Sequence, residues 1–235
     1  MMSHLSRRGF LGCLCCAGAA GIVLPGHPAW AAAGAKTTMT PDQALAALKE
    51  GNDKFITDAP YRQVNDRDRR LEIARGQTPF SVLVSCSDSR VPPELLFGRG
   101  LGELFIVRIA GNTVDTTALG SIEYGVVELG VTLVVVLGHE KCGAVDAAVK
   151  VVKENATFPG AIGQMIEPIV PAVLRAQAQP GDLLDNAIRE NVRRTVNRLR
   201  TSEALLQEPL RSGKLKIVGA RYDLDNGDVD FFDEG

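Results

Sequence analysis

The stretch that decides the fold is FSVLVSCSDSR, from Phe80 to Arg90, in which a continuous apolar run ends in a polar turn. An apolar run of this kind, here Phe80 to Val84, is typical of a strand buried on both faces of a sheet. The polar turn that follows this run carries a thiol at Cys86 and a carboxylate at Asp88. We therefore expect an interior strand of a parallel sheet that carries functional groups at its carboxyl end.

Further apolar runs outside this stretch extend the same pattern. Residues 104–107 and 131–137 indicate two more buried strands, and a helical stripe lies between them at Leu119, Ile122, Val126 and Leu129. Alternating strands and helices predict a single α/β domain with a mostly parallel central sheet flanked by helices. The runs 215–221 and 229–232 flank Asn226-Gly227 and predict a C-terminal antiparallel hairpin.

Helix signals fill most of the remaining chain. A capping-box pattern at Thr40 begins a helix that we expect to end near Lys49, because Gly51-Asn52 follows. Further helices are predicted from about 66 to 76 and at 143–153, 161–177 and 182–200. We expect the arginines of the last helix to be solvated rather than ligand-binding; they are Arg189, Arg193, Arg194, Arg198 and Arg200.

Residues 1–31 have the features of an export signal. Arg7-Arg8 precedes an apolar stretch that runs to about Leu24, and Ala29-Trp30-Ala31 fits a cleavage site. We predict a twin-arginine signal peptide at 1–31, a linker at 32–39, a catalytic domain at 40–235 and a periplasmic location. Retention of the leader as an anchor is the alternative.

The charge of the chain without this leader argues against a nucleic-acid partner. Removing Arg7 and Arg8 from 26 basic residues leaves 24 against 28 acidic ones, a net charge of −4. Nothing after the leader offers an apolar run of about 18 residues, so we expect no stable membrane span.

Cysteine usage concentrates attention on two positions. Of five cysteines, three lie in the leader, which leaves Cys86 and Cys142. In an oxidising compartment a disulfide between them is one interpretation. Metal binding before export is the other, because the twin-arginine pathway carries folded proteins.

A second turn, GHEKCG at 138–143, also closes an apolar run. His139 and Cys142 are three residues apart, a spacing at which both side chains can reach one ion, and Cys86 would supply a third ligand for zinc. From the H-x-x-C spacing alone, a structural zinc site, a Cys-His nucleophilic pair and a buried core histidine also remain open. Asp88 could complete the ligand set or stand beside an open position, and Arg90 could orient it and lower its pKa.

Four separated motifs now carry a family resemblance. They are CSDSR at 86–90, RIAGN at 108–112, SIEYG at 121–125 and GHEKCGA at 138–144. In order and spacing the chain resembles the β-class carbonic anhydrases from about residue 40 to its C-terminus. The resemblance implies one zinc ion per subunit on Cys86, His139 and Cys142, with Asp88 and Arg90 as a catalytic dyad and Asp88 as a possible fourth ligand in a closed state.

The resemblance also implies a substrate pocket and a partner subunit. Gln77, Phe105, Tyr124 and Gly143 match substrate-binding positions, and the first three can come from the neighbouring subunit of a homodimer or of a larger assembly of dimers. One departure concerns the inhibitory bicarbonate site of some members. Arg108 matches its arginine, but Leu83 stands where those members have tryptophan, so we do not expect that regulation here.

We therefore predict a zinc lyase that interconverts carbon dioxide and bicarbonate, in which Asp88 orients the attacking hydroxide or relays its proton. Hydrolysis of a sulfur analogue such as carbon disulfide is the alternative activity. A non-catalytic protein that binds zinc or an anion is the alternative of another class, and the joint presence of Gln77, Asp88 and Arg90 disfavours it.

Overall fold

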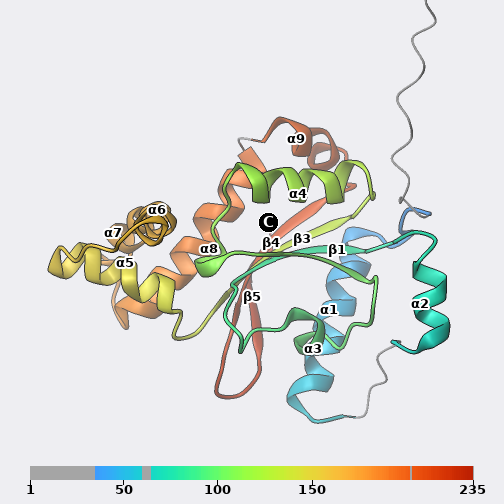
Figure 1. Ribbon diagram of the computed structural model, residues 1–235, viewed down its shortest axis with the longest axis horizontal. Coiled ribbons are helices and arrows are strands. Elements are labelled where there is room, and N and C mark those ends of the chain that lie inside the picture. The colour runs from blue at the N-terminus through green and yellow to red at the C-terminus, as the bar shows by residue number, and fades with distance from the viewer. Residues whose placement is uncertain (1–34, 60–64, 202, 235) are drawn as a thin grey trace, which may run out of the picture. The chain divides into compact units, whose positions relative to one another are not determined.

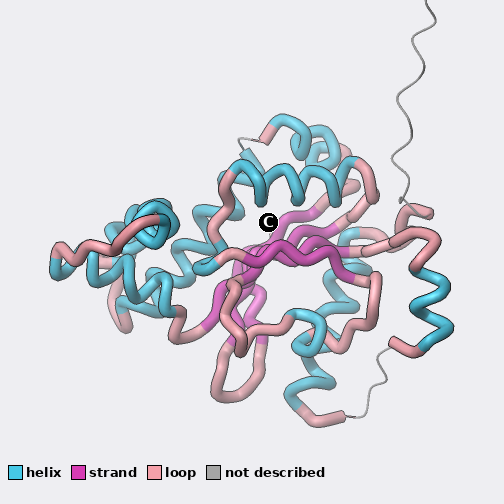
Figure 2. The backbone as a smooth tube through the Cα atoms, in the orientation of Figure 1, coloured by secondary structure: helices cyan, strands magenta, loops and turns pink. Residues whose placement is uncertain are grey.

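A parallel sheet with one antiparallel edge forms the centre of the computed structural model, which describes residues 35–59, 65–201 and 203–234 (Figures 1 and 2). In these residues the strand order is β2-β1-β3-β4-β5, and only β5 runs antiparallel to its neighbour. The strands are β1 (Ser81–Ser85), β2 (Leu104–Arg108), β3 (Leu133–His139), β4 (Lys216–Tyr222) and β5 (Val229–Asp233). The predicted fold class and hairpin are confirmed.

Helices cover both faces of this sheet. They are α1 (Pro41–Ile56), α2 (Arg67–Ile73), α3 (Pro93–Leu96), α4 (Thr116–Val127), α5 (Gly143–Glu154), α6 (Ala161–Ile166), α7 (Val170–Ala176), α8 (Leu183–Thr201) and α9 (Ala204–Arg211), with 3-10 turns η1 (Ala110–Asn112) and η2 (Glu167–Ile169). None of the helices in the described ranges is long and apolar enough to cross a membrane. The predicted leader lies outside the described residues, so the export signal stays a prediction.

Strand residues alternate between two cores. Val82 and Val84 face α4, α8 and α9, whereas Leu83 faces α1 and α3. Because β1 and β3 are buried on both faces, both read as unbroken apolar runs. A third core joins α5, α7 and the start of α8 and includes Cys86 and Cys142.

The predicted end of the first helix is wrong. The capping box at Thr40 is present, but α1 continues through Gly51 and Asn52 to Ile56. Asn52 is buried, and its side chain donates to Leu96 O and Gly227 O and accepts from Val229 N. Tertiary hydrogen bonds therefore hold a helix that local propensity would end.

Gly51 marks the close approach of α1 to α3. A Cβ atom at this position would lie 2.0 Å from Phe97 O, a backbone atom that cannot rotate away. We expect Gly51→Ala to lower the free energy of unfolding by about 1–3 kcal/mol, the usual cost of overpacking. Gly120→Ala is the matched control, because Gly120 lies in α4 with nothing within 4 Å, and there alanine should add about 0.5–1 kcal/mol. Equal responses of the two variants in chemical denaturation would contradict this account.

Two of the five arginines of α8 depart from the predicted solvated face, whereas Arg193 and Arg198 are exposed. Arg189 pairs with Asp230 at 2.7 Å and Arg200 with Asp233 at 2.7 Å, so both tie the helix to β5. The single helix predicted at 161–177 is also divided, into α6, η2 and α7. The ion pairs are tertiary contacts that helical periodicity does not contain, whereas the divided helix has a local cause, because Pro168 and Pro171 lack the N–H groups that a continuous helix needs.

Candidate metal centre

The carboxyl ends of β1 and β3 bring the three predicted ligands together. Cys86 directly follows β1, and His139 is the last residue of β3 rather than the first beyond it. Lys141 then adopts a left-handed φ of 52°, and Cys142 is the N-cap of α5. Since β1 and β3 are adjacent parallel strands in register from Ser81↔Leu133, their ends meet at the same edge.

The ligand atoms of Cys86, His139 and Cys142 all lie within 4.8 Å of one another. The three residues are 4%, 0% and 1% exposed. His139 Nδ1 lies 2.8 Å from the carbonyl oxygen of Glu140, so it carries the proton and leaves Nε2 as a lone-pair donor. Nε2 is buried and has no hydrogen-bond partner among the described residues. Two sulfurs and one imidazole nitrogen are the donors that zinc prefers.

The two cysteines are free thiols rather than a disulfide. The neighbouring Cys142 thiol lowers the pKa of Cys86 to about 4, and the Gly111 N–H, which donates to the Cys86 sulfur, acts in the same direction. The Cys86 sulfur in turn raises the pKa of Cys142. Like charges oppose a second thiolate here, so a cation between the sulfurs is what would allow both to ionise. The residues present therefore fit a bound zinc ion.

Asp88 lies beside this cluster and is held by Arg90. Arg90 Nε donates to Asp88 Oδ1 at 2.9 Å, and its second amino nitrogen donates to Oδ2 at 2.8 Å. This guanidinium holds the pKa of Asp88 well below its usual range. Asp88 Oδ2 is 3.9 Å from His139 Nε2, so the carboxylate is ionised and adjacent to the ligands while both its oxygens are occupied by Arg90.

A hydrogen-bond relay supports Cys86 from behind. The Gly111 N–H donates to Cys86 Sγ at 3.2 Å, and Asn191 Nδ2 donates to Gly111 O at 2.8 Å. Gly111 has φ 70°, and a Cβ there would lie 2.6 Å from Ile169 Cδ1, so the position suits glycine alone. No sequence pattern points to Asn191, because it lies 80 residues beyond Gly111, to which it donates.

Comparison with known proteins agrees with this geometry. The family model described as carbonic anhydrase matches residues 81–229, which is more than half of the chain. "Carbonic anhydrase 2" of Mycobacterium tuberculosis is 40% identical over 80% of this chain and 90% of its own length. The carbonic anhydrase of Mycolicibacterium smegmatis is 37% identical over 81% of this chain and 92% of its own length. The solved structure of the β-carbonic anhydrase CcaA has a TM-score of 0.63, with 27% identity over 80% of this chain and 95% of that one.

The chain belongs to the β-class carbonic anhydrases. The expected fold and enzyme class are thereby confirmed.

In this β-class carbonic anhydrase Arg108 has a structural task. Its Nε donates to Cys86 O at 2.9 Å, and its second amino nitrogen donates to Asp88 O at 2.6 Å. Arg108 therefore fixes the backbone of the loop that carries both side chains. Leu83 is fully buried in the core on the α1 side of the sheet.

Three predicted substrate-binding residues of the carbonic anhydrase lie elsewhere in this chain. Gln77 precedes β1, whereas Cys86 follows it, and the four residue steps of β1 alone span about 13 Å. Phe105 pairs with Val82 near the start of β1, and the ring of Tyr124 lies 6.1 Å from that of Phe105. Phe105 and Tyr124 therefore lie together at the edge strand β2, and Gln77 lies before the amino end of β1, opposite the end that carries Cys86.

Gly143, the fourth such residue, is the first residue of α5 and directly follows Cys142. A Cβ atom there would meet nothing within 4 Å, so the side of Gly143 is open. Of the four predicted substrate-binding residues, Gly143 is the one that the chain itself places next to a predicted metal ligand.

Proposed function

We propose that this carbonic anhydrase hydrates carbon dioxide reversibly to bicarbonate with one zinc ion on Cys86, His139 and Cys142. The buried, unpartnered Nε2 of His139 beside two thiols carries the proposal. When bound, zinc supplies a Lewis acid that lowers the pKa of water to produce a nucleophile. Asp88, kept ionised by Arg90, would accept a hydrogen bond from that nucleophile and orient it towards carbon.

The chain's own residues prepare Asp88 for this role. With Arg90 on both oxygens and Arg108 on its backbone carbonyl, the carboxylate has little freedom to turn. Such positioning is the part of catalysis that protein side chains contribute without moving during the reaction. A protein that only stores zinc would need the ligands but not this pair.

Stopped-flow hydration of carbon dioxide, combined with a zinc determination on the same sample, tests the proposal. We expect turnover in proportion to zinc content. Stoichiometric zinc without hydration would contradict it, and turnover of carbon disulfide in place of carbon dioxide would support the sulfur-analogue alternative.

Titration of Asp88 should not change the rate of hydration in the neutral pH range. Arg90 lowers the pKa of this carboxyl and keeps it charged there. Two thiolates would cancel the charge of zinc, so its water should ionise less readily than at a three-histidine site, where the pKa is about 7. We therefore expect activity to rise towards alkaline pH, with a midpoint above about 7. A stopped-flow profile already at its maximum at pH 6 would contradict this.

We further propose that the working site is completed by a second copy of the chain in a homodimer. Gln77 lies before the amino end of β1, and Phe105 and Tyr124 lie at the amino-terminal half of the edge strand β2, so all three are far from the cluster. A two-fold axis near that edge would bring these residues of one subunit towards the cluster of the other. The catalytic roles of Asp88 and Arg90 and the binding role of Gly143 belong to the same proposal.

Mixing two inactive variants tests the shared site. In a heterodimer of Cys142→Ser and Gln77→Ala subunits, one site carries both changes and the other carries neither. Subunit exchange should therefore restore activity, up to about one quarter of the wild-type value for random pairing of C2 dimers. Exchange without recovery, while each variant keeps its dimeric mass, would show that Gln77 acts within its own subunit.

A further inference from the structure

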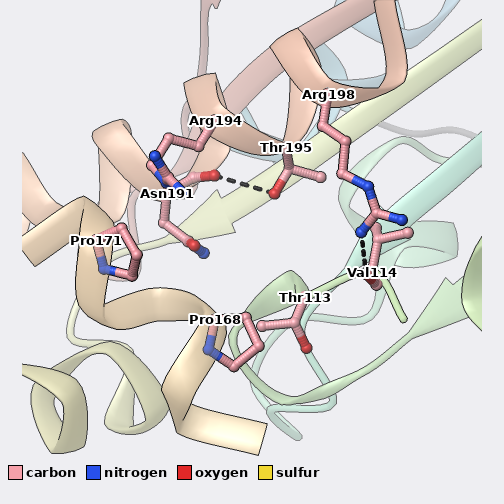
Figure 3. Close-up of a pocket in the computed structure, with 8 residues that line it drawn as sticks. All are labelled: Thr113, Val114, Pro168, Pro171, Asn191, Arg194, Thr195 and Arg198. Carbon is pink, nitrogen blue, oxygen red and sulfur yellow. Dashed lines mark hydrogen bonds between the residues drawn. The ribbon is translucent and has the colours of Figure 1, made fainter. Parts of the chain in front are cut away.

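A cavity of about 250 Å³ lies beside α8, away from the ligand cluster. Figure 3 shows Arg194 and Asn191 at one end of it and Arg198 at the other. Val114, Pro168 and Pro171 provide apolar surface. None of the predicted metal ligands lines the cavity, although Asn191 in its wall also bonds to Gly111 behind Cys86.

The positive charge of this cavity is only half compensated. Arg198 Nε pairs with Glu203 at 2.9 Å, and another of its nitrogens donates to Val114 O at 2.6 Å. Arg194, one helical turn earlier on the same face of α8, has no hydrogen bond or ion pair with any described residue. No acidic side chain lines the cavity. An anion would therefore supply the charge that Arg194 lacks.

Hydrogen-bond donors converge on the same space. None of the five N–H groups of Arg194 donates a hydrogen bond to a described residue. Asn191 Nδ2 has two N–H groups and donates one of them to Gly111 O. The hydroxyl of Thr195 donates its proton to Asn191 O at 3.0 Å, so Arg194 and Asn191 are the donors that a ligand in the cavity would meet (Figure 3). A planar guanidinium matches the two oxygens of a carboxylate in a bidentate pair.

We propose that this cavity binds a small carboxylate with a short apolar chain. The carboxylate would pair with Arg194 and accept from Asn191, and its chain would contact Val114 and the two prolines. A volume of about 250 Å³ is below the usual range for drug-sized ligands, which favours a molecule of few atoms. Phosphate is hydrophilic on all sides and would leave the apolar wall without a partner.

Ligand-observed NMR with butanoate tests the site on the zinc-loaded full-length protein. We expect saturation transfer to butanoate in the wild type and affinity weaker by about tenfold or more in Arg194→Gln, because a charge-assisted pair is lost. Arg193→Gln is the matched control. This variant removes the same charge from the preceding residue, which packs over Phe232, and should bind butanoate as the wild type does.

Any binding of butanoate at the zinc ligands would be the same in the wild type, Arg194→Gln and Arg193→Gln. The part of the butanoate binding that is lost in Arg194→Gln therefore belongs to the cavity. Unchanged affinity in Arg194→Gln would overturn the proposal. Displacement of butanoate by equal concentrations of chloride or phosphate would overturn the carboxylate class. Arg194→Lys, which keeps charge without the planar fork, should bind between the wild type and Arg194→Gln. The measurement needs no turnover, so its result is independent of the proposed hydration activity.

Discussion

Cys142→Ser should remove stoichiometric zinc and reduce carbon dioxide hydration to the uncatalysed background. The Cys142 sulfur is one of three donor atoms within 4.8 Å, and a serine hydroxyl does not ionise readily enough to replace a thiolate. Because zinc binding would stabilise the folded state, the variant should also unfold at a lower temperature than the zinc-loaded wild type.

Elemental analysis after gel filtration measures this effect directly. Cys16→Ser is the matched control, since the same chemical change then falls in the predicted leader and should leave zinc content unchanged. One zinc ion per subunit retained in Cys142→Ser would show that Cys142 is not a ligand.

Asp88→Asn should retain zinc and the fold while hydration falls by roughly 10² to 10⁴, the usual range for a positioned acid or base. Asparagine keeps the shape of Asp88 but loses the charge that pairs with Arg90. The two oxygens that accept from Arg90 become one oxygen and one amide, so the orientation of the side chain is lost as well.

Asp225→Asn is a control for the loss of a carboxylate near the same loops. Asp225 pairs with Lys141 on the surface, 76% exposed, and the change should alter turnover by less than about twofold. If Asp88→Asn hydrates carbon dioxide at close to the wild-type rate, the assignment of the dyad fails.

The sequence motifs predicted the central parallel strands and the residues at their ends, because the patterns that specify them lie within short stretches of the chain. A buried parallel strand is an unbroken apolar run, and in such a sheet the residues after adjacent strands meet. The strand ends at Cys86 and His139 could therefore be placed together from the sequence, and the bidentate pair between Asp88 and Arg90 is confirmed.

Other contacts could not be predicted because they join distant segments. Asn52 keeps α1 helical through bonds to residues 44 to 177 positions away, and Asn191 reaches Gly111 across 80 positions. The helix α9 contains Pro209, and an internal proline argues against a helix when the sequence is considered alone. Gln77, Phe105 and Tyr124 are a different case, because in the proposed homodimer they would act at the cluster of the second copy.

The position of the ligands on the sheet also has an entropic consequence. Cys86 and His139 are fixed by the register of β1 and β3, whose hydrogen bonds form when the chain folds. Their conformational freedom would therefore be lost on folding, before any ion arrives. Cys142 is 1% exposed at the N-cap of α5, so the fold holds the third predicted ligand as well. Binding of zinc to these three residues would therefore cost little further conformational entropy, because folding has already ordered the segments that carry them.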